Sequence, residues 1–360
     1  MSVTFNGVEL ETTFNMTAIG RGTYGAAERD IEQIHVPGRN GDLLYDNGGF
    51  KNVNVVFPCS IISDFPANAR ELRNFLLGSP GYHKLVDSYH PDEYRMAEFR
   101  GPFEPDVHTY RNNDSANFDL VFNCKPQRWL ADAETNVCYP HCTLDASNVT
   151  GDPWTYEFRF FLEAGKTCEL DLQADNVASS AWTYSYTKDG TTSVIAIPTV
   201  DGGEYTFTAV RDCYMSIKIV STAGDCFLRL RIDGKFFEVR GVNKNYGTVL
   251  SNPTYFNSEP VITVTFRKTE SNLLTCKWGT KETGAQVNQF TVDVSGLTRG
   301  SVYTYVFDSE YETVKTAAGV DKLSTFNGAF PYFAGGKDNF IAFTGADRIV
   351  TEYQTKFWRV

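Results

Sequence analysis

The sequence lacks the motifs of the common enzyme classes. None of GxSxG, HExxH, GxxxxGK[ST] or GxGxxG ahead of a helix occurs in its 360 residues. One pair of carboxylates, Asp308 and Glu310, has the spacing of side chains that point to the same side of a strand, as a glycosidase could use. Such pairs are common by chance, and a solvated strand face explains this one more simply. We therefore expect no catalytic residues, and a glycan-cleaving enzyme is the weakest alternative.

The sequence also has no excess of basic residues and no long apolar run. Lys and Arg number 33 against 44 Asp and Glu, which gives a formal net charge of -11. This balance argues against a general phosphate-neutralising surface for DNA or RNA. No run approaches the length that spans a bilayer, and residues 1–10 lack a basic segment followed by an apolar core. We expect a soluble protein with no membrane partner, made in a cytoplasm.

The cysteines follow no framework spacing. They are Cys59, Cys124, Cys138, Cys142, Cys168, Cys213, Cys226 and Cys276. In a reducing compartment, cysteines scattered through apolar segments are expected to be buried free thiols. Cys138, His141 and Cys142 form a cluster that could hold zinc, but a structural site needs four ligands and no second CxxC or HxxxH appears. We predict no metal and no cofactor.

What the sequence contains is strands, together with one convincing helix. Apolar residues recur at helical spacing from Phe65 to Leu76, and Gly78 followed by Pro80 ends the pattern. A single amphipathic helix in a strand-rich chain is expected to cover an open face of a sheet. Interleaved charged and apolar residues at 85–99 predict a hairpin directly after it.

Alternating apolar and polar residues predict many short strands. Residues 53–57 and 118–122 alternate in this way, and Pro126 is expected to close the second strand, with a domain boundary near Leu130. The glycine-rich stretch at 46–49 predicts a turn between strands.

Three domains are expected, all mainly β. Residues 1–130 hold the helix, and residues 131–247 hold short strands separated by regularly spaced glycine turns, which is typical of a β-sandwich. Residues 248–360 show another series of alternating strands, so a second sandwich is predicted there.

Several segments outside the middle region occur in a familiar order. They are FNG at 5–7, GRNG at 38–41, GYHKLVDSYHPDEYRMAEF at 81–99, FNCKPQRWL at 122–130, LSNPTYFNSEP at 250–260, FNGAFPYFAGGKDNFIAFTG at 326–345 and TKFWRV at 355–360. In this order they resemble the distal tail protein family of long-tailed bacteriophages. The middle region resembles the inserted carbohydrate-binding module of enlarged family members.

The resemblance implies a virion structural protein at the tail tip, or baseplate. It implies an N-terminal β domain with one helix that forms a ring, usually a homohexamer, and a C-terminal galectin-like β-sandwich. Family members join the tail tube protein to tail-associated, tape measure and receptor-binding proteins, and phage DNA passes through the ring without sequence-specific binding. The inserted jelly-roll module would serve host recognition by binding cell-wall polysaccharide.

Four residues of the middle region are candidates for such glycan binding. Trp154, Trp182 and Tyr184 could stack on sugar rings, and Asn176 could bind hydroxyl groups. Trp182 is the first choice because it follows the small, polar run 178–181, which is typical of a loop that emerges into a strand. For any one aromatic residue, the sandwich core is the simpler explanation. A stand-alone carbohydrate-binding protein is the alternative to a tail hub.

The polar, glycine-rich loop at 18–30 is a candidate for contact between neighbouring subunits of a ring. Its residues Arg21, Tyr24 and Arg29 could form a heterologous, closing interface. A surface loop without a partner is the alternative.

Overall fold

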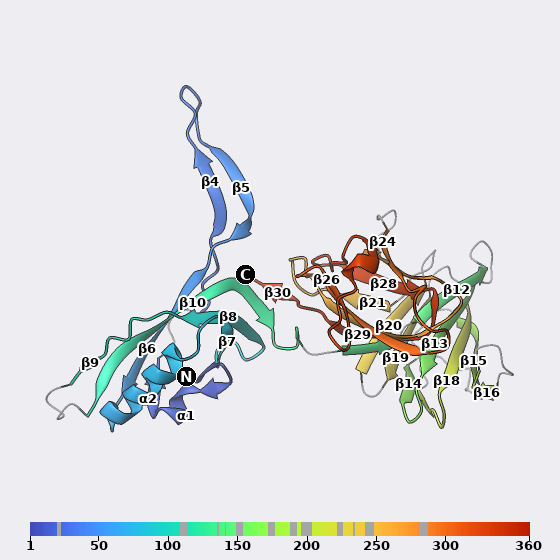
Figure 1. The fold of residues 1–360 in the computed structure, drawn as a ribbon, viewed down its shortest axis with the longest axis horizontal. Helices are drawn as coiled ribbons and strands as arrows, with labels where there is room; N and C mark the ends of the chain where they lie inside the picture. Colours follow the sequence, from blue (N-terminus) through green and yellow to red (C-terminus); the bar gives the residue numbers. More distant parts are fainter. Residues whose placement is uncertain are drawn as a thin grey trace. The chain divides into compact units, whose positions relative to one another are not determined.

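The computed structural model describes most of residues 1–360 (Figure 1). The residues outside the description are 20–22, 109–113, 135–136, 141, 149–153, 172–176, 188–192, 196–203, 222–225, 233–234, 242–247 and 281–286. The backbone alone is described for 137–140, 142–148, 154–158, 170–171, 177–180, 193–195, 204–205, 219, 221, 226–232, 235–241 and 248–249.

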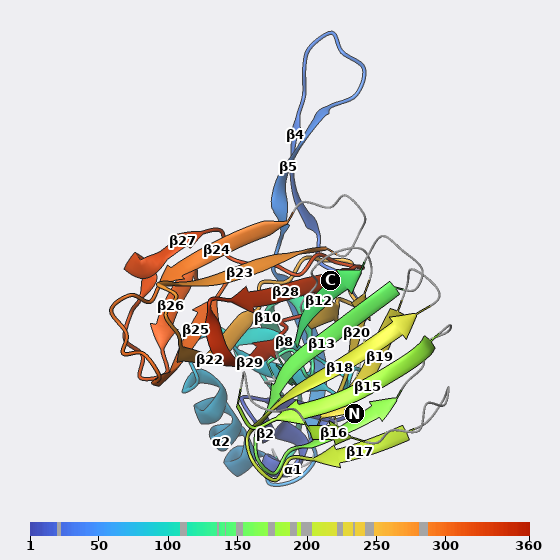
Figure 2. The same ribbon diagram turned by 90° about the vertical axis from the view of Figure 1, so that its right-hand side faces the viewer.

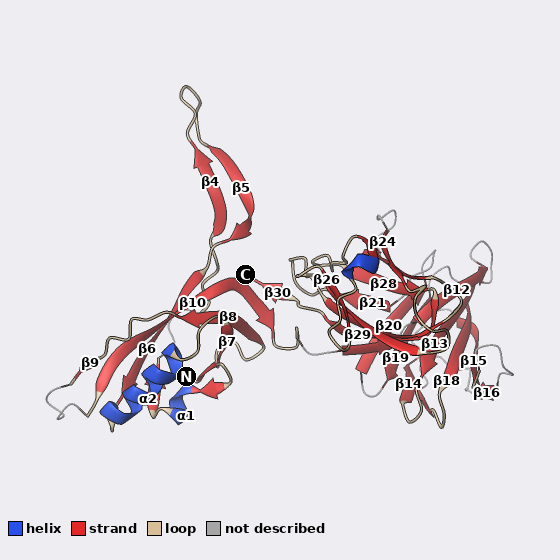
Figure 3. Cartoon of the chain, viewed as in Figure 1, coloured by secondary structure: helices blue, strands red, loops and turns tan. Residues whose placement is uncertain are grey.

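The protein is mainly β, as predicted, and its chain divides into two compact units (Figure 3). The first unit comprises Met1–Ala133 and Trp358–Val360, and the second comprises Glu134–Phe357. The last strand of the chain therefore belongs to the first unit, whereas the sequence pattern grouped it with the rest of 248–360. Within the described residues, no helix is both long enough and apolar enough to cross a lipid bilayer.

The first unit is built on one sheet. Its elements are β1 (Val3–Phe5), β2 (Val8–Glu9), α1 (Leu10–Thr13), β3 (Met16–Ala18), β4 (Arg29–Ile34), β5 (Leu43–Phe50), β6 (Val53–Ile61), α2 (Phe65–Leu77), β7 (His83–Asp87), β8 (Glu93–Phe99), β9 (Asp106–Val107), β10 (Ala116–Leu130) and β30 (Trp358–Arg359). The sheet runs in the order β2-β1-β7-β8-β10-β6-β3, and β9 and β30 also pair with β10. The long strand β10 thus contacts four other strands and organises the unit.

Helix α2 covers this sheet, which confirms the helix predicted from the periodicity. It spans Phe65–Leu77 and buries Phe65, Ala69, Leu72 and Leu76 in the same apolar cluster as the inward residues of the strands. Proline in its first turn leaves no hydrogen bond unmade, because that N–H has no intrahelical acceptor. The predicted hairpin after the helix is present as β7 and β8.

Strand β10 does not end at Pro126, contrary to the prediction. It continues to Leu130, and its pairing with β8 shifts register between Cys124 and Arg128. Proline is tolerated at such an irregularity because a bulged residue needs no ladder hydrogen bond from its N–H. The shift places Arg128 directly opposite Arg95 of β8.

Strands β4 and β5 form a separate two-stranded hairpin that projects from the first unit (Figure 1). Residues 46–49 do not form the predicted turn, because they lie inside β5. The Gly48 N–H there donates to Asp46 Oδ1 at 2.8 Å, and Gly48 has a φ of 78°, which accounts for the local turn signal. The tip of the hairpin falls at 35–42, around Gly38 and Gly41.

The second unit contains four sheets. Its strands are β11 (Val137–Pro140), β12 (Cys142–Asn148), β13 (Trp154–Leu162), β14 (Thr167–Asp171), β15 (Val177–Ser185), β16 (Ser193–Ile195), β17 (Glu204–Thr208), β18 (Cys213–Ser221), β19 (Cys226–Ile232), β20 (Lys235–Gly241), β21 (Thr248–Ser251), β22 (Val261–Lys268), β23 (Leu273–Thr280), β24 (Asn288–Asp293), β25 (Val302–Asp308), β26 (Thr313–Thr316), β27 (Phe326–Gly328), β28 (Asp338–Thr344) and β29 (Ala346–Gln354). A 3₁₀ turn, η2, spans Leu323–Thr325.

These sheets pair into two sandwiches. The first, which we call the middle sandwich, consists of the sheet β12-β13-β18-β15-β16 and the sheet β17-β14-β19-β20 (Figure 2). Tyr184 of the first sheet contacts Phe207 of the second, with 5.2 Å between the ring centroids. In the second, which we call the C-terminal sandwich, Phe307 of the sheet β11-β29-β22-β25-β26 lies 5.1 Å from Phe290 of the sheet β21-β28-β23-β24-β27. Aromatic pairs of this kind, half-buried in the middle sandwich and fully buried in the C-terminal one, hold the two layers of each sandwich together.

Polar contacts join the two sandwiches within the second unit. Arg348 binds Asp212 at 3.0 Å and lies 5.1 Å over the ring of Phe161. The Tyr214 hydroxyl donates to Asp347 at 2.9 Å. The start of the middle region, β11, pairs with β29 and so belongs to a sheet of the C-terminal sandwich.

Candidate functional site

The described residues contain no arrangement typical of a metal centre, and the predicted pair of carboxylates does not have the predicted geometry. Among them, no group of three or more His, Cys, Asp and Glu side chains could hold a metal ion. The proposed zinc cluster at 138–142 falls where side chains are not described. Asp308 and Glu310 do not share a strand as predicted, because β25 ends at Asp308 and Glu310 lies in the following turn, bound to Lys356 at 3.1 Å.

Four exposed apolar residues of the first unit lie on the projecting hairpin. Ile34, Leu43, Leu44 and Tyr45 are 44%, 40%, 66% and 61% exposed, and we call these four residues the hairpin patch. They lie near the tip on both strands, where Ile34 is the register partner of Leu43. A two-stranded hairpin is marginally stable in water by itself, and its edges offer unpaired backbone groups to another chain. By strand alternation, Ile34, Leu43 and Tyr45 lie on one face of the hairpin and Leu44 on the other, so apolar side chains are exposed on both faces. Exposed apolar residues gathered in this way mark an interaction surface.

Two of the three residues predicted to contact a neighbouring subunit, Tyr24 and Arg29, lie at or beside the base of this hairpin. Tyr24 is 71% exposed, and its ring lies 4.6 Å from that of His90. Arg29 begins β4, pairs with Asp46 at 3.0 Å and lies 5.1 Å from the centre of the Phe50 ring. Arg21 lies outside the described residues. Their role as subunit contacts stays a prediction, and the hairpin patch was not foreseen, although the run Leu43-Leu44-Tyr45 was visible in the sequence.

Trp182, the first choice for a sugar-stacking residue, is wrong in that role because it is fully buried. It has no exposed surface and its register partners are Ile217 and Ile195 in the neighbouring strands of its sheet. The preceding run, which was taken for an emerging loop, is itself part of β15, so Trp182 lies well inside a strand. The side chain of Trp154, and Asn176 altogether, lie outside the described residues.

Tyr184, the remaining aromatic candidate, belongs to a partly exposed aromatic cluster at the end of β15. Its ring lies 5.4 Å from that of Tyr186, which is 44% exposed, and the Arg211 guanidinium lies 5.6 Å from the centre of the Tyr186 ring. We call Tyr184, Tyr186 and Arg211 the tyrosine platform. A hydrogen bond with Tyr184 raises the pKa of Tyr186 above its usual value. An aromatic face beside a polar, donor-rich side chain is a surface on which a sugar ring can stack.

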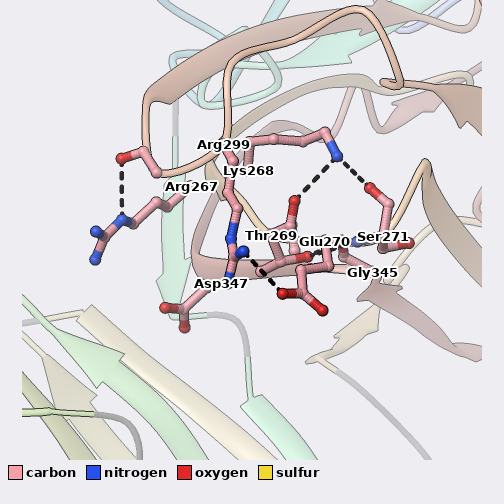
Figure 4. Close-up of a pocket in the computed structure, with 10 residues that line it drawn as sticks. Arg267, Lys268, Thr269, Glu270, Ser271, Arg299, Gly345 and Asp347 are labelled. Carbon is pink, nitrogen blue, oxygen red and sulfur yellow. Dashed lines mark hydrogen bonds and ion pairs between the residues drawn. The ribbon is translucent and has the colours of Figure 1, made fainter.

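The C-terminal sandwich carries a polar cavity of about 630 Å³ at one end of its strands (Figure 4). Its lining residues are Arg267, Lys268, Thr269, Glu270, Ser271, Arg299, Gly300, Gly345, Ala346 and Asp347. Its cations already have partners in the chain: Arg299 binds Glu270 at 2.8 Å, Arg267 donates to a backbone carbonyl at 3.0 Å, and the buried Lys268 ammonium donates to the Thr269 and Ser271 carbonyls. With no aromatic residue in its lining, this cavity offers no stacking surface to a sugar.

The fold is similar to that of a solved structure from a bacteriophage. That structure is the crystal structure of the Dit protein (gp 19.1) of SPP1, described as a paradigm of the hub adsorption apparatus in phages that infect Gram-positive bacteria. The TM-score is 0.51 at 10% sequence identity, and the similarity covers 98% of this chain and 97% of that chain. At this identity the comparison shows a shared fold. Comparisons with protein-family models and with curated protein sequences gave no match.

Proposed function

We propose that this protein is a structural hub of a phage tail tip, in which several copies form a ring. The similarity to the SPP1 Dit protein supports this function because it extends over nearly the whole of both chains. The single observation that carries the proposal further is the projecting β4–β5 hairpin, whose apolar patch has no partner surface within the described chain. A surface of this kind is expected where a chain assembles with other chains.

Ring closure gives the hairpin a physical role. In a ring, each subunit presents one surface to the next in a head-to-tail contact, so the hairpin of one copy would lie on a different surface of its neighbour. Burial of Leu44 and Tyr45 there would remove apolar surface from water, and the edge of β4 or β5 would gain hydrogen bonds. The mechanism is then geometric: the ring positions other proteins and leaves a lumen. Following the family resemblance, its partners would be the tail tube protein and the tape measure, tail-associated and receptor-binding proteins, with phage DNA passing through.

Particle mass and a pair of matched variants test the hub proposal. We expect purified full-length protein at high concentration to form particles near six times 40.3 kDa by light scattering, and rings in electron micrographs. Leu44→Ser should lower the particle mass towards that of the monomer, while Ile62→Ser should leave it unchanged, because Ile62 is similarly exposed at 64% but lies outside the hairpin. Monomers at every concentration, or an intact ring with Leu44→Ser combined with Tyr45→Ser, would contradict the proposal.

The tyrosine platform favours a second role in host recognition. We propose that the middle sandwich binds host cell-wall polysaccharide through Tyr186 and Tyr184, with Arg211 available to bind hydroxyl groups. Tyr186→Ala in the full-length protein should weaken binding to purified cell walls roughly tenfold, which corresponds to about 1.4 kcal/mol. Tyr255→Ala is the matched control, because Tyr255 is 94% exposed on the C-terminal sandwich. Equal cell-wall binding by both variants would contradict a glycan-binding role of the tyrosine platform. Cell-wall binding by a protein that stays monomeric would favour a free-standing lectin over a hub.

A further inference from the structure

The sheet of the first unit contains two buried arginines directly opposite each other. Arg95 of β8 and Arg128 of β10 are register partners, and each is 6% exposed. Among the described residues, Glu93 is the one carboxylate at ion-pair distance from either: its Oε2 lies 3.7 Å from Arg128 Nη1, while its Oε1 binds Arg359 at 2.8 Å. Two buried cations therefore share one carboxylate that a third arginine already uses. Buried charge without compensation is strongly unfavourable, so such a pair calls for another negative group.

Polar atoms without partners surround a small cavity at this pair. Within the described part of the chain, no hydrogen-bond partner is present for the buried atoms Arg95 Nη1, Arg128 Nη2, Thr23 Oγ1 and His90 Nε2. All four residues line one cavity of about 10 Å³, which has room for about one water-sized sphere. Guanidinium nitrogens can only donate hydrogen bonds, so the missing group must accept at least two of them.

The charge of the surroundings distinguishes an anion from a water molecule. A water could accept from both arginines, but it would add no negative charge to the site, whereas an anion would. The cavity is lined by Arg95 and Arg128 and by the carboxylates of Asp87 and Glu93. Because Arg359 also binds Glu93, three arginines share these two carboxylates. Burial, and after it the charge of Arg128, lowers the pKa of Arg95, while the charges of Asp87 and Glu93 act in the opposite direction.

We propose that this cavity binds a small monovalent inorganic anion, chloride, between Arg95 and Arg128. The Thr23 hydroxyl would donate a third hydrogen bond to it. Arg95 also donates from Nη2 to the Gly25 carbonyl at 3.0 Å, and the Tyr24 ring lies against His90. The anion would therefore fasten residues 23–25, four residues ahead of β4, to the sheet, and so set the base of the projecting hairpin. This inference is independent of ring formation, because it concerns the interior of one subunit.

Halide replacement tests the site in the full-length protein. At constant ionic strength, replacing gluconate by chloride should raise the first unfolding temperature by about 2–4 °C, and the rise should saturate with chloride concentration. A ligand that binds only the folded state stabilises that state. Hydrogen exchange of the amides at 23–29 should slow by roughly tenfold in chloride, since opening of this segment would release the anion. Crystals grown in bromide should show an anomalous peak between the two guanidinium groups.

Three variants make the result decisive. Arg95→Met should abolish the chloride response, and Thr23→Val, which keeps the side-chain shape, should weaken it even if Arg95→Met fails to fold. Arg100→Met is the matched control, one residue beyond the end of the same strand, because its guanidinium is exposed and paired with Glu98, and it should keep the full response. A cavity that shows no bromide peak, with equal stability in chloride and gluconate, would mean that it holds water only and would overturn the proposal. An equal chloride response in Thr23→Val and in the unmodified protein would also count against it.

Discussion

Replacing Glu93 by glutamine is expected to destabilise the first unit far more than the same change at Glu98. Both residues lie on β8 and both pair with arginine, but their surroundings differ. The side chain of Glu93 is 9% exposed and lies between Arg128 and Arg359, whereas the Glu98–Arg100 pair is largely in water, with the arginine side chain 61% exposed. The comparison therefore holds the strand and the chemical change constant and varies the burial of the ion pair.

The magnitude follows from the charge that each variant leaves behind. Removing one partner of a buried ion pair costs about 3–5 kcal/mol, because the other charge stays buried without compensation. Glu93→Gln leaves Arg128 in that state, while Arg359 is half exposed and can turn to water, so the lower end, about 3 kcal/mol, is expected. Exposed pairs contribute about 0–1 kcal/mol, which sets the expectation for Glu98→Gln.

Urea unfolding and carboxypeptidase digestion can measure the two consequences. Trp129 and Trp358 lie 6.5 Å apart on paired strands of the first unit, so tryptophan fluorescence reports the loss of β30. Glu93→Gln should unfold at lower urea and lose its last residues faster, because Arg359 no longer holds that strand to β8. Similar stability losses of less than about 1 kcal/mol in both variants would refute the reasoning that burial makes this carboxylate important.

Three further predictions concern packing and protonation. Trp182→Ala should cost about 3–5 kcal/mol in thermal unfolding, since the indole has no exposed surface and its removal leaves a cavity. Gly345→Ala should destabilise by at least about 2 kcal/mol more than Gly319→Ala. Both glycines have positive φ, but a Cβ at Gly345 would overlap the Leu273 carbonyl oxygen, whereas Gly319 faces open space. Burial raises the pKa of Cys59 and of Cys168 to about 12, while an unfolded thiol ionises near pH 8.5. The unfolded chain therefore releases these protons first, and stability measured by urea titration should fall from about pH 9 towards pH 12, by up to about 1.4 kcal/mol per thiol and pH unit.

Local patterns were sufficient to predict the elements that depend on one stretch of chain. The helix at Phe65–Leu77 was foreseen because four apolar residues repeat at helical spacing and a glycine and a proline follow them. The mainly β class followed from alternation, since a strand with one buried face shows period two wherever it lies in the fold. These features need no knowledge of which strands pair.

Features that depend on partner strands could not be predicted in this way. The burial of Trp182 depends on the sheet that covers it. The alternating sequence pattern of a strand is the same whether its tryptophan faces a sandwich core or the solvent. A proline ends most strands, but here a register shift between β10 and β8 accommodates Pro126. The buried pair Arg95 and Arg128 arises from the same register shift, and two arginines 33 positions apart give no sign of it in the sequence.

The strand pairings also explain how the chain can carry long insertions. The chain leaves the first unit after β10 and returns as β30, and Trp358 pairs with Trp129 of β10, so the exit and the return are adjacent. The second unit repeats this arrangement, because β11 joins the sheet of the C-terminal sandwich, the next nine strands form the middle sandwich, and β21 resumes the C-terminal one. Insertions whose ends lie close together can be added without disturbing the host sheet. Each nested part can therefore change its outer surface while the sheet that bears the hairpin keeps its shape.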